Sequence, residues 1–289
     1  MKMSLPHWKP LRFARLVEMA APIDLSIVIV NWNTAGLLCD CLRALYAAPS
    51  RRTFETIIVD NASSDESVTR VRREFPQAQI IQNTQNLGFA RGNNQGLRAS
   101  QGHYVLLLNS DTQASSSALE ALLDFMDHHP EAGACGPRLL KPEGGIQPFA
   151  FGEDPTPGYL LRRAFNRLLF QRPLHDWNTD RVQVVGFIAG TCLLVRRTAI
   201  QQAGLLDEGF FMYFEDNDWC RRFREHGWKI YYCPQAAILH VGGQSIARNP
   251  QAREAYYHSL RYFYARHYRW PARLWLWLAL PWYRQVVRY

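Results

Sequence analysis

The sequence predicts an α/β protein built on a doubly wound, mostly parallel sheet. Two short apolar runs rich in β-branched residues, 25–30 and 56–59, are typical of strands buried on both faces. Apolar residues at helical spacing separate these runs, so the order is strand, helix, strand, which implies a right-handed parallel crossover. Because the alternation continues, we expect helices on both faces of the sheet.

The remaining elements follow from periodicity and from turn residues. In the first half we predict helices at 37–45, 66–75 and 93–99, and strands at 79–82 and 104–108. In the second half we predict helices at 159–170, 216–226 and 251–268, and strands at 182–186, 191–195, 229–233 and 237–240. No tandem repeat or long linker divides the chain into independent domains.

Composition excludes several classes of protein. The chain has 289 residues, 47% hydrophobic and 20% charged, which excludes a disordered chain, a collagen and a small disulfide scaffold. The net charge is +8, yet residues 1–247 hold 25 basic and 24 acidic side chains, whereas residues 248–289 hold eight Arg and one Glu. The excess of basic residues therefore lies in the tail, and a nearly neutral sheet domain argues against a nucleic-acid partner.

The tail also holds 12 of the 37 aromatic residues. Arg interleaved with Trp and Tyr is typical of a membrane interface, and the apolar run 274–283 is about half of the ~20 residues that span a bilayer. Two interpretations stay open: an extension that lies on a membrane, and a C-terminal helix docked on its own domain. We expect a basic leader at 1–23, one domain at 24–247 and a helical, membrane-associating extension at 248–289.

Other motifs are absent from the sequence. The six cysteines lack C-x-x-C spacing, which argues against a zinc site and a disulfide framework, and the leader lacks the apolar stretch of a secretory signal. We therefore expect a cytoplasmic protein, peripheral on the inner face of the cell membrane. Neither a P-loop nor G-x-G-x-x-G spacing occurs, which disfavours P-loop and nicotinamide enzymes.

Polar residues end several of the predicted strands. Asn31, Asp60 and the pair Asn109 and Asp111 follow apolar runs, and the carboxyl ends of parallel strands form the ligand crevice of such sheets. A second acidic group lies at 215–218, and His240 ends another strand. Oxygen ligands without a phosphate loop suggest an anionic ligand that is held through a divalent cation.

At this point the chain resembles the family 2 glycosyltransferases, inverting enzymes of the GT-A fold, and within them the bacterial rhamnosyltransferase-like branch. The resemblance covers residues 24–268. The motifs that carry it lie, in the family's order, at 27–33, 59–65, 86–96, 108–111, 190–195, 215–219 and 240–243.

The resemblance implies roles for the residues at the strand ends. Donor-nucleotide binding falls to Asn31, Asp60, Asn86, Arg91 and Ser110. The metal-binding D-x-D motif is reduced to 109–111, so Asp111 and His240 are expected to hold Mg²⁺ or Mn²⁺.

The acidic motif supplies the base that the resemblance implies. Asp216 is expected to take the proton of the acceptor hydroxyl, and Asp218 is the alternative. Glu215, Gly190 and Thr191 are expected to position the substrate.

The predicted function is transfer of a sugar, rhamnose first, from a nucleotide-diphosphate donor to a hydroxyl of a glycan or lipid-linked acceptor in bacterial cell-surface polysaccharide synthesis. One alternative is a processive polysaccharide synthase, but 266–270 has Arg where the Q-x-x-R-W motif of those enzymes has Gln. A sugar nucleotidyltransferase would have a Gly-rich basic loop after the first strand, and 31–36 lacks one. A non-catalytic binding protein of the same fold, associated with the membrane, is the third.

Overall fold

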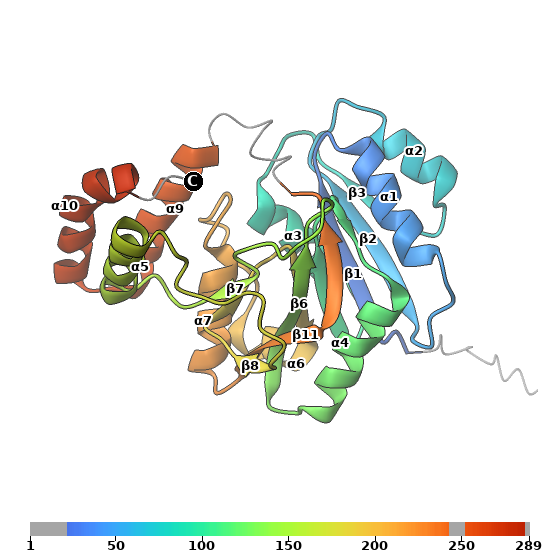
Figure 1. Ribbon diagram of the computed structural model, residues 1–289. Helices are drawn as coiled ribbons and strands as arrows, with labels where there is room; N and C mark the ends of the chain where they lie inside the picture. The colour runs from blue at the N-terminus through green and yellow to red at the C-terminus, as the bar shows by residue number, and fades with distance from the viewer. Residues whose placement is uncertain (1–21, 243–251, 287–289) are drawn as a thin grey trace, which may run out of the picture.

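The computed structural model describes residues 22–242 and 252–286, and the predicted leader 1–23 and the junction of domain and extension lie largely outside them. The central sheet has nine strands within the described residues, in the order β3-β2-β1-β4-β10-β6-β11-β5, with β8 beside β11 (Figure 1). The main strands are β1 (Leu25–Asn31), β2 (Phe54–Asp60), β3 (Gln79–Gln82), β4 (Tyr104–Leu108), β6 (Ala132–Leu140), β10 (Cys192–Arg196) and β11 (Lys229–His240). The short strands are β5 (Thr112–Gln113), β7 (Phe151–Gly152), β8 (Gln183–Val184) and β9 (Phe187–Ile188).

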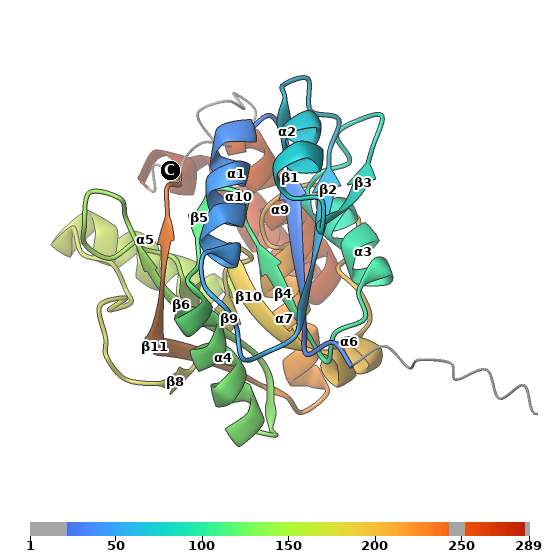
Figure 2. The same ribbon diagram turned by 90° about the vertical axis from the view of Figure 1, so that its right-hand side faces the viewer.

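The first half is the predicted crossover unit. β1 pairs in parallel with β2 and β4, and β2 pairs in parallel with β3. The helices between these strands are α1 (Ala35–Tyr46), α2 (Ser67–Glu74) and α3 (Phe89–Ala99). α1, α2 and α4 (Ser116–His128) cover one face of the sheet, while α3, α6 (Arg197–Ala203) and α7 (Glu215–Glu225) cover the other (Figure 2). The prediction of a doubly wound sheet is confirmed.

The second half departs from the parallel pattern. β10 runs antiparallel to β4 and β6, whereas β11 is parallel to β6, so the sheet is mixed. The strands predicted at 229–233 and 237–240 are one strand, β11, whose register shifts between Cys233 and Ala237. The strand predicted at 182–186 is present but shorter, as the two-residue β8, and β9 of the small second sheet follows it.

A second hydrophobic core lies beside the sheet. It joins α5 (Pro157–Phe170) to α9 (Ala252–His267) and α10 (Trp270–Val286). Leu276, Leu280 and Tyr283 of α10 are buried in it, so the C-terminal helix docks on its own domain. The opposite side of α10 stays exposed. Within the described residues, no helix has both the length and the apolar composition needed to cross a bilayer.

Candidate active site

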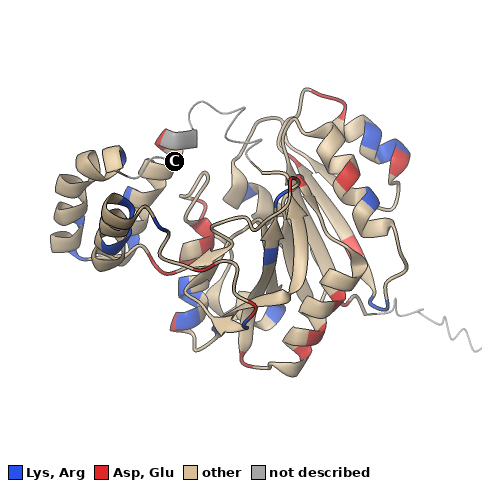
Figure 3. Cartoon of the chain, in the orientation of Figure 1, with Lys and Arg blue, Asp and Glu red and all other residues tan. Residues whose placement is uncertain are grey.

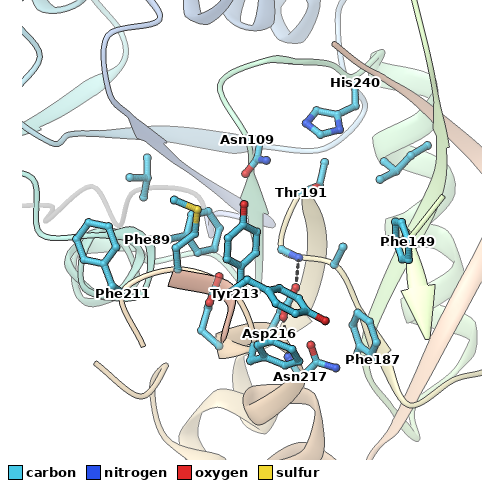
Figure 4. A pocket seen from close by; sticks show the side chains of 18 of the residues that line it. Phe89, Asn109, Phe149, Phe187, Thr191, Phe211, Tyr213, Asp216, Asn217 and His240 are labelled. Carbon is cyan, nitrogen blue, oxygen red and sulfur yellow. Dashed lines mark hydrogen bonds between the residues drawn. The ribbon is translucent and has the colours of Figure 1, made fainter. Parts of the chain in front are cut away.

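A cavity of about 400 Å³ lies at the carboxyl ends of β1 and β4. Its walls come from the starts of α3 and α7, from the loop before α7, and from α5 and α9 (Figure 4). The parallel arrangement of β1 and β4 gathers the polar residues that follow them at this edge, as the topology requires. Eight of the predicted site residues line the cavity, namely Asn86, Ser110, Asp111, Gly190, Thr191, Glu215, Asp216 and His240.

Asp216 projects into the cavity from the first turn of α7. Its Oδ2 accepts a hydrogen bond from the backbone N–H of Gly190 at 2.9 Å, drawn in Figure 4, and its Oδ1 accepts one from the N–H of Asn217 at 2.8 Å. Burial raises the pKa of Asp216, although these two N–H donors oppose the rise. A fixed carboxylate with a raised pKa is suited to accepting a proton from a bound hydroxyl.

Glu215 precedes Asp216 and is more deeply enclosed. Its side chain lines the cavity, and its Oε2 has no hydrogen-bond partner among the described residues. Burial, reinforced by the charge of Asp216, raises the pKa of Glu215 well above its ordinary value. The raised pKa favours the neutral carboxyl group, which can donate a hydrogen bond to a ligand hydroxyl.

Asp218, the alternative base, lies behind the cavity rather than in it. Its Oδ1 accepts a hydrogen bond from His267 Nε2 at 2.7 Å, and its Oδ2 accepts one from Arg222 Nε at 2.8 Å. Its side chain is fully buried, and both carboxylate oxygens are engaged. This geometry supports a structural role for Asp218 and leaves Asp216 as the better candidate for the base.

Asp111 and His240 meet because of strand pairing. Asp111 immediately precedes β5, whose Thr112 lies opposite His240 in the antiparallel pair with β11. Asp111 Oδ1 is 3.1 Å from His240 Nε2, and both side chains are buried at the cavity wall. His240 Nδ1 lies 2.8 Å from Gln147 Oε1, and this contact orients the imidazole with its Nε2 toward Asp111.

This donor set fits a divalent cation. A carboxylate oxygen of Asp111 and an imidazole nitrogen of His240 lie close together, and the side-chain amide of Gln147 orients the imidazole. Two protein ligands leave the other coordination positions for phosphate oxygens and water, as Mg²⁺ and Mn²⁺ accept. No group of three or more His, Cys, Asp and Glu side chains suited to a metal occurs in the described part of the chain.

Asn31 and Asp60 belong to a hydrogen-bond network beside the cavity and do not line it. Asn31 Nδ2 donates to Asp60 Oδ1 at 3.0 Å, and Asn31 Oδ1 accepts from Thr34 Oγ1 at 2.6 Å. Thr34 Oγ1 lies 2.9 Å from Ser110 Oγ, so the network ends at the cavity wall. The ends of β2, β1 and β4 are thereby fixed relative to one another.

Asn86 and Arg91, both predicted to bind the donor nucleotide, lie in different surroundings. Asn86 lines the cavity, and its Oδ1 accepts a hydrogen bond from the N–H of Gly88 at 2.9 Å. Gly88 has φ +83°, and a Cβ there would lie 2.6 Å from the Phe211 ring and carbonyl, so the turn requires glycine. Arg91 is exposed, lies 3.7 Å from Glu208 and does not line the cavity.

The structure adds residues that sequence reasoning did not assign to the site. Arg163 of α5 is the one Lys or Arg among the described residues that line the cavity. Its guanidinium lies 5.2 Å from the Phe149 ring centroid, and its Nη1 is 3.4 Å from the Tyr256 hydroxyl of α9. Gln147 is the second addition. The motif pattern held no signal for either residue, because both lie outside the strand ends.

Comparison with known proteins identifies the family. The model of "Glycosyl transferase family 2" matches residues 26–203, more than half of the chain. An N-acetylglucosaminyl-diphospho-decaprenol L-rhamnosyltransferase of Mycobacterium tuberculosis is 30% identical over 269 residues, 85% of this chain and 86% of that protein. A low-salt glycan biosynthesis hexosyltransferase of Haloferax volcanii is 29% identical over 221 residues, 75% of this chain and 67% of that protein.

Solved structures support the same fold. GalNAc-T7, solved with UDP, GalNAc and Mn²⁺, matches 76% of this chain and 44% of its own with a TM-score of 0.58 at 15% identity. A Pyrobaculum calidifontis mannosyltransferase, in complex with GDP-Man and Mn²⁺, matches 81% of this chain and 62% of its own with a TM-score of 0.54 at 16% identity. The chain thus spans less than two thirds of either structure. It has the GT-A fold, belongs to glycosyl transferase family 2 and is a rhamnosyltransferase-like glycosyltransferase.

Proposed function

We propose that the protein transfers a sugar, rhamnose in the first instance, from a nucleotide-diphosphate donor to a hydroxyl group of a glycan or lipid-linked acceptor, with inversion at the anomeric carbon. The observation that carries the proposal is that Asp216 lines the same cavity as the pair Asp111 and His240. The N–H of Gly190 holds the carboxylate of Asp216 in place. When the diphosphate leaves, positive charge develops on the attacking hydroxyl and negative charge on the diphosphate. A base serves the first charge and a cation the second, and both sites lie in one cavity.

The proposed chemistry is a single displacement. The acceptor oxygen forms a bond to the anomeric carbon while the bond from that carbon to the diphosphate oxygen breaks on the opposite face. Asp216 takes the proton of the acceptor hydroxyl, and Glu215, as a neutral carboxyl group, donates a hydrogen bond to a sugar hydroxyl. Asp111 and His240 would hold Mg²⁺ or Mn²⁺, which supplies positive charge to the leaving diphosphate when bound.

The donor nucleotide is proposed to lie along the ends of β1, β2 and β4. Asn86 and Ser110 line the cavity there, while Asn31 and Asp60 hold the strand ends behind them. Arg91 reaches a bound diphosphate only if it leaves Glu208. We favour dTDP-rhamnose as the donor over a UDP-sugar, and the name of the Mycobacterium tuberculosis relative, an L-rhamnosyltransferase, supports rhamnose as the sugar.

The acceptor is proposed to approach along α5 and α9, where Arg163 supplies a positive charge, and to contact Gly190 and Thr191, which also line the cavity. This charge suits an acceptor joined to its lipid through phosphate, at the inner face of the cell membrane in cell-surface polysaccharide synthesis.

One experiment tests the proposal directly. The purified protein is incubated with a panel of nucleotide sugars, Mn²⁺ and a detergent-dispersed polyprenyl-diphosphate saccharide, and products are followed by mass spectrometry. Transfer from dTDP-rhamnose with inverted configuration is the expected result. Absence of transfer and of nucleotide binding across the panel would contradict the proposal.

A further inference from the structure

Two helices from distant parts of the sequence form one end of the molecule. α5 and α10 pack against each other, at the left of Figure 1. Five large hydrophobic side chains of each helix are exposed, so the two helices hold ten of the fourteen exposed large hydrophobic side chains among the described residues. The ten are Leu161, Phe165, Leu168, Leu169 and Phe170 of α5, and Trp270, Leu274, Trp277, Leu278 and Trp282 of α10. We call this surface the α5/α10 face.

The exposed side chains are not required by the packing of the two helices. Leu160 and Ala164 bury the inner side of α5, and Leu276 and Leu280 bury the inner side of α10 in the second core. Each helix is therefore apolar on its outer side as well, where water meets the side chains. Exposed apolar side chains gathered on two helices that pack together mark an interaction site, since such side chains are costly to leave in water.

The charges around the α5/α10 face select its partner. Neither α5 nor α10 contains an Asp or Glu, and together they carry five arginines, Arg162, Arg163, Arg167, Arg273 and Arg284 (Figure 3). Arg162 is paired with Glu153, and Arg284 with Glu254, whereas Arg167 is exposed. Arginines beside exposed Trp, Phe and Leu complement an anionic lipid surface, with Trp at the level of the headgroups.

We propose that the α5/α10 face docks the protein on an anionic bilayer, with α5 as an equal partner of the C-terminal helix. The inference rests on the proposed function in one respect, the use of a lipid-linked acceptor. The inner side of α5 lines the cavity through Tyr159, Leu160 and Arg163. Docking through α5 therefore brings a cavity wall to the bilayer surface, where the sugar of a lipid-linked acceptor lies.

Flotation with vesicles tests the docking face without any use of activity. The full-length protein is mixed with phosphatidylcholine vesicles that contain 0% or 30% phosphatidylglycerol, and the bound fraction is measured. Phe165→Ser in α5 and Trp277→Ser in α10 are each expected to weaken partitioning roughly tenfold, because each removes a large apolar side chain from the lipid. Arg167→Gln is expected to weaken binding about fivefold, on anionic vesicles only.

A matched control uses Val184→Ser, because Val184 of β8 is an exposed apolar residue away from both helices. It is expected to bind like the wild type. All variants alter exposed side chains, and circular dichroism with thermal unfolding checks that they remain folded.

Three results would overturn the proposal. They are unchanged partitioning of Phe165→Ser, an equal loss in Val184→Ser, and a stable dimer in sedimentation that Phe165→Ser dissociates while vesicles stay unbound. Titration of dTDP on the same samples separates this inference from the proposed function. Loss of flotation with intact nucleotide binding leaves the donor site untouched, whereas flotation without nucleotide binding contradicts the function and not the docking face.

Discussion

His267, the last residue of α9, donates a hydrogen bond to the buried carboxylate of Asp218 in the acidic motif, with Nε2 and Oδ1 2.7 Å apart. Arg222 holds the other oxygen of Asp218. The extension is thus fastened directly to α7, the helix that presents Asp216 to the cavity. This contact explains why an acidic residue that faces away from the cavity lies within the motif.

Removal of one partner from this buried group should destabilise the fold. We expect Asp218→Ala to lower the free energy of unfolding by about 3 kcal/mol, because it leaves His267 and Arg222 buried without their anion. Urea unfolding monitored by tryptophan fluorescence measures the change. His258→Ala, at an exposed position of the same helix, is the control and should be neutral. An equal loss in both variants would show that the pair has no special role.

The same pair predicts how stability depends on pH. Burial alone would raise the pKa of Asp218, but the hydrogen bond from His267 and the charge of Arg222 outweigh it and lower the pKa. A lowered pKa in the folded state means that the stabilisation is fully present above the unfolded-state pKa of about 4 and is lost as pH falls through the folded-state pKa. The stability difference between wild type and Asp218→Asn should therefore shrink as pH is lowered from 7 to 3. A difference that grows toward acid would contradict this assignment.

Asp216 predicts a pH dependence of the rate. Because burial raises its pKa, kcat/KM should fall on the acid side of an inflection above the ordinary Asp value of about 4. Asp216→Asn should lower turnover by roughly 10²–10⁴-fold and remove this inflection, while dTDP still binds. Turnover measured from pH 4 to 8 provides both readouts. Wild-type turnover in Asp216→Asn would exclude the residue as the base.

Glu215 calls for a different substitution. Its raised pKa favours the neutral carboxyl group, and an amide resembles that group because it also donates hydrogen bonds. We expect Glu215→Gln to retain most of the activity and Glu215→Ala to raise the KM for the sugar donor. A loss of turnover in Glu215→Gln as large as that in Asp216→Asn would show that Glu215 acts as a charged group.

The sequence predicted the parallel strands of the first half, but it missed the helices α4 and α6 and the strand β6. The strands at 79–82 and 104–108 were found at their predicted limits, because the apolar run marks each of them, although β4 is buried and β3 is not. β6 was missed since its sequence contains Gly133, Gly136 and Pro137. A Cβ at Gly133 would lie 2.6 Å from Trp228 and one at Gly136 would lie 2.1 Å from Ile188, so close packing selected glycine over the residues that mark a strand.

The site divides in the same way. Asp111, His240 and Asp216 were predicted from strand ends and motif order, and they line one cavity. Arg163 and Gln147 were not assigned to it, because a helix and a loop of the second half carry them there. Only tertiary packing brings those segments to the strand ends, and the local sequence does not predict that packing.

If Asp111 and His240 bind the cation, variants around them should differ in their affinity for Mn²⁺. Asp111→Asn and His240→Ala each remove a ligand and should abolish tight binding of Mn²⁺ in the presence of dTDP. Gln147→Ala leaves both ligands but frees the imidazole, which should weaken binding 10–100-fold. Gln113→Ala, an exposed position on β5, serves as the control. Electron paramagnetic resonance titration measures free Mn²⁺, and equal affinities across all four variants would remove the proposed cation site.

Arg163 provides the test of the acceptor end. If its guanidinium binds the phosphate of the acceptor, Arg163→Gln should raise the KM for a polyprenyl-diphosphate acceptor about tenfold or more, since a charge-assisted hydrogen bond is lost. The affinity for dTDP and the rate of donor hydrolysis should not change, because Arg163 lies on the wall formed by α5 and α9. Arg162→Gln is the matched control, since Arg162 is the preceding residue but is exposed and pairs with Glu153. Acceptor dispersed in detergent removes the contribution of membrane docking. A fall in dTDP affinity in Arg163→Gln, with the KM for the acceptor unchanged, would instead assign this arginine to the phosphates of the donor.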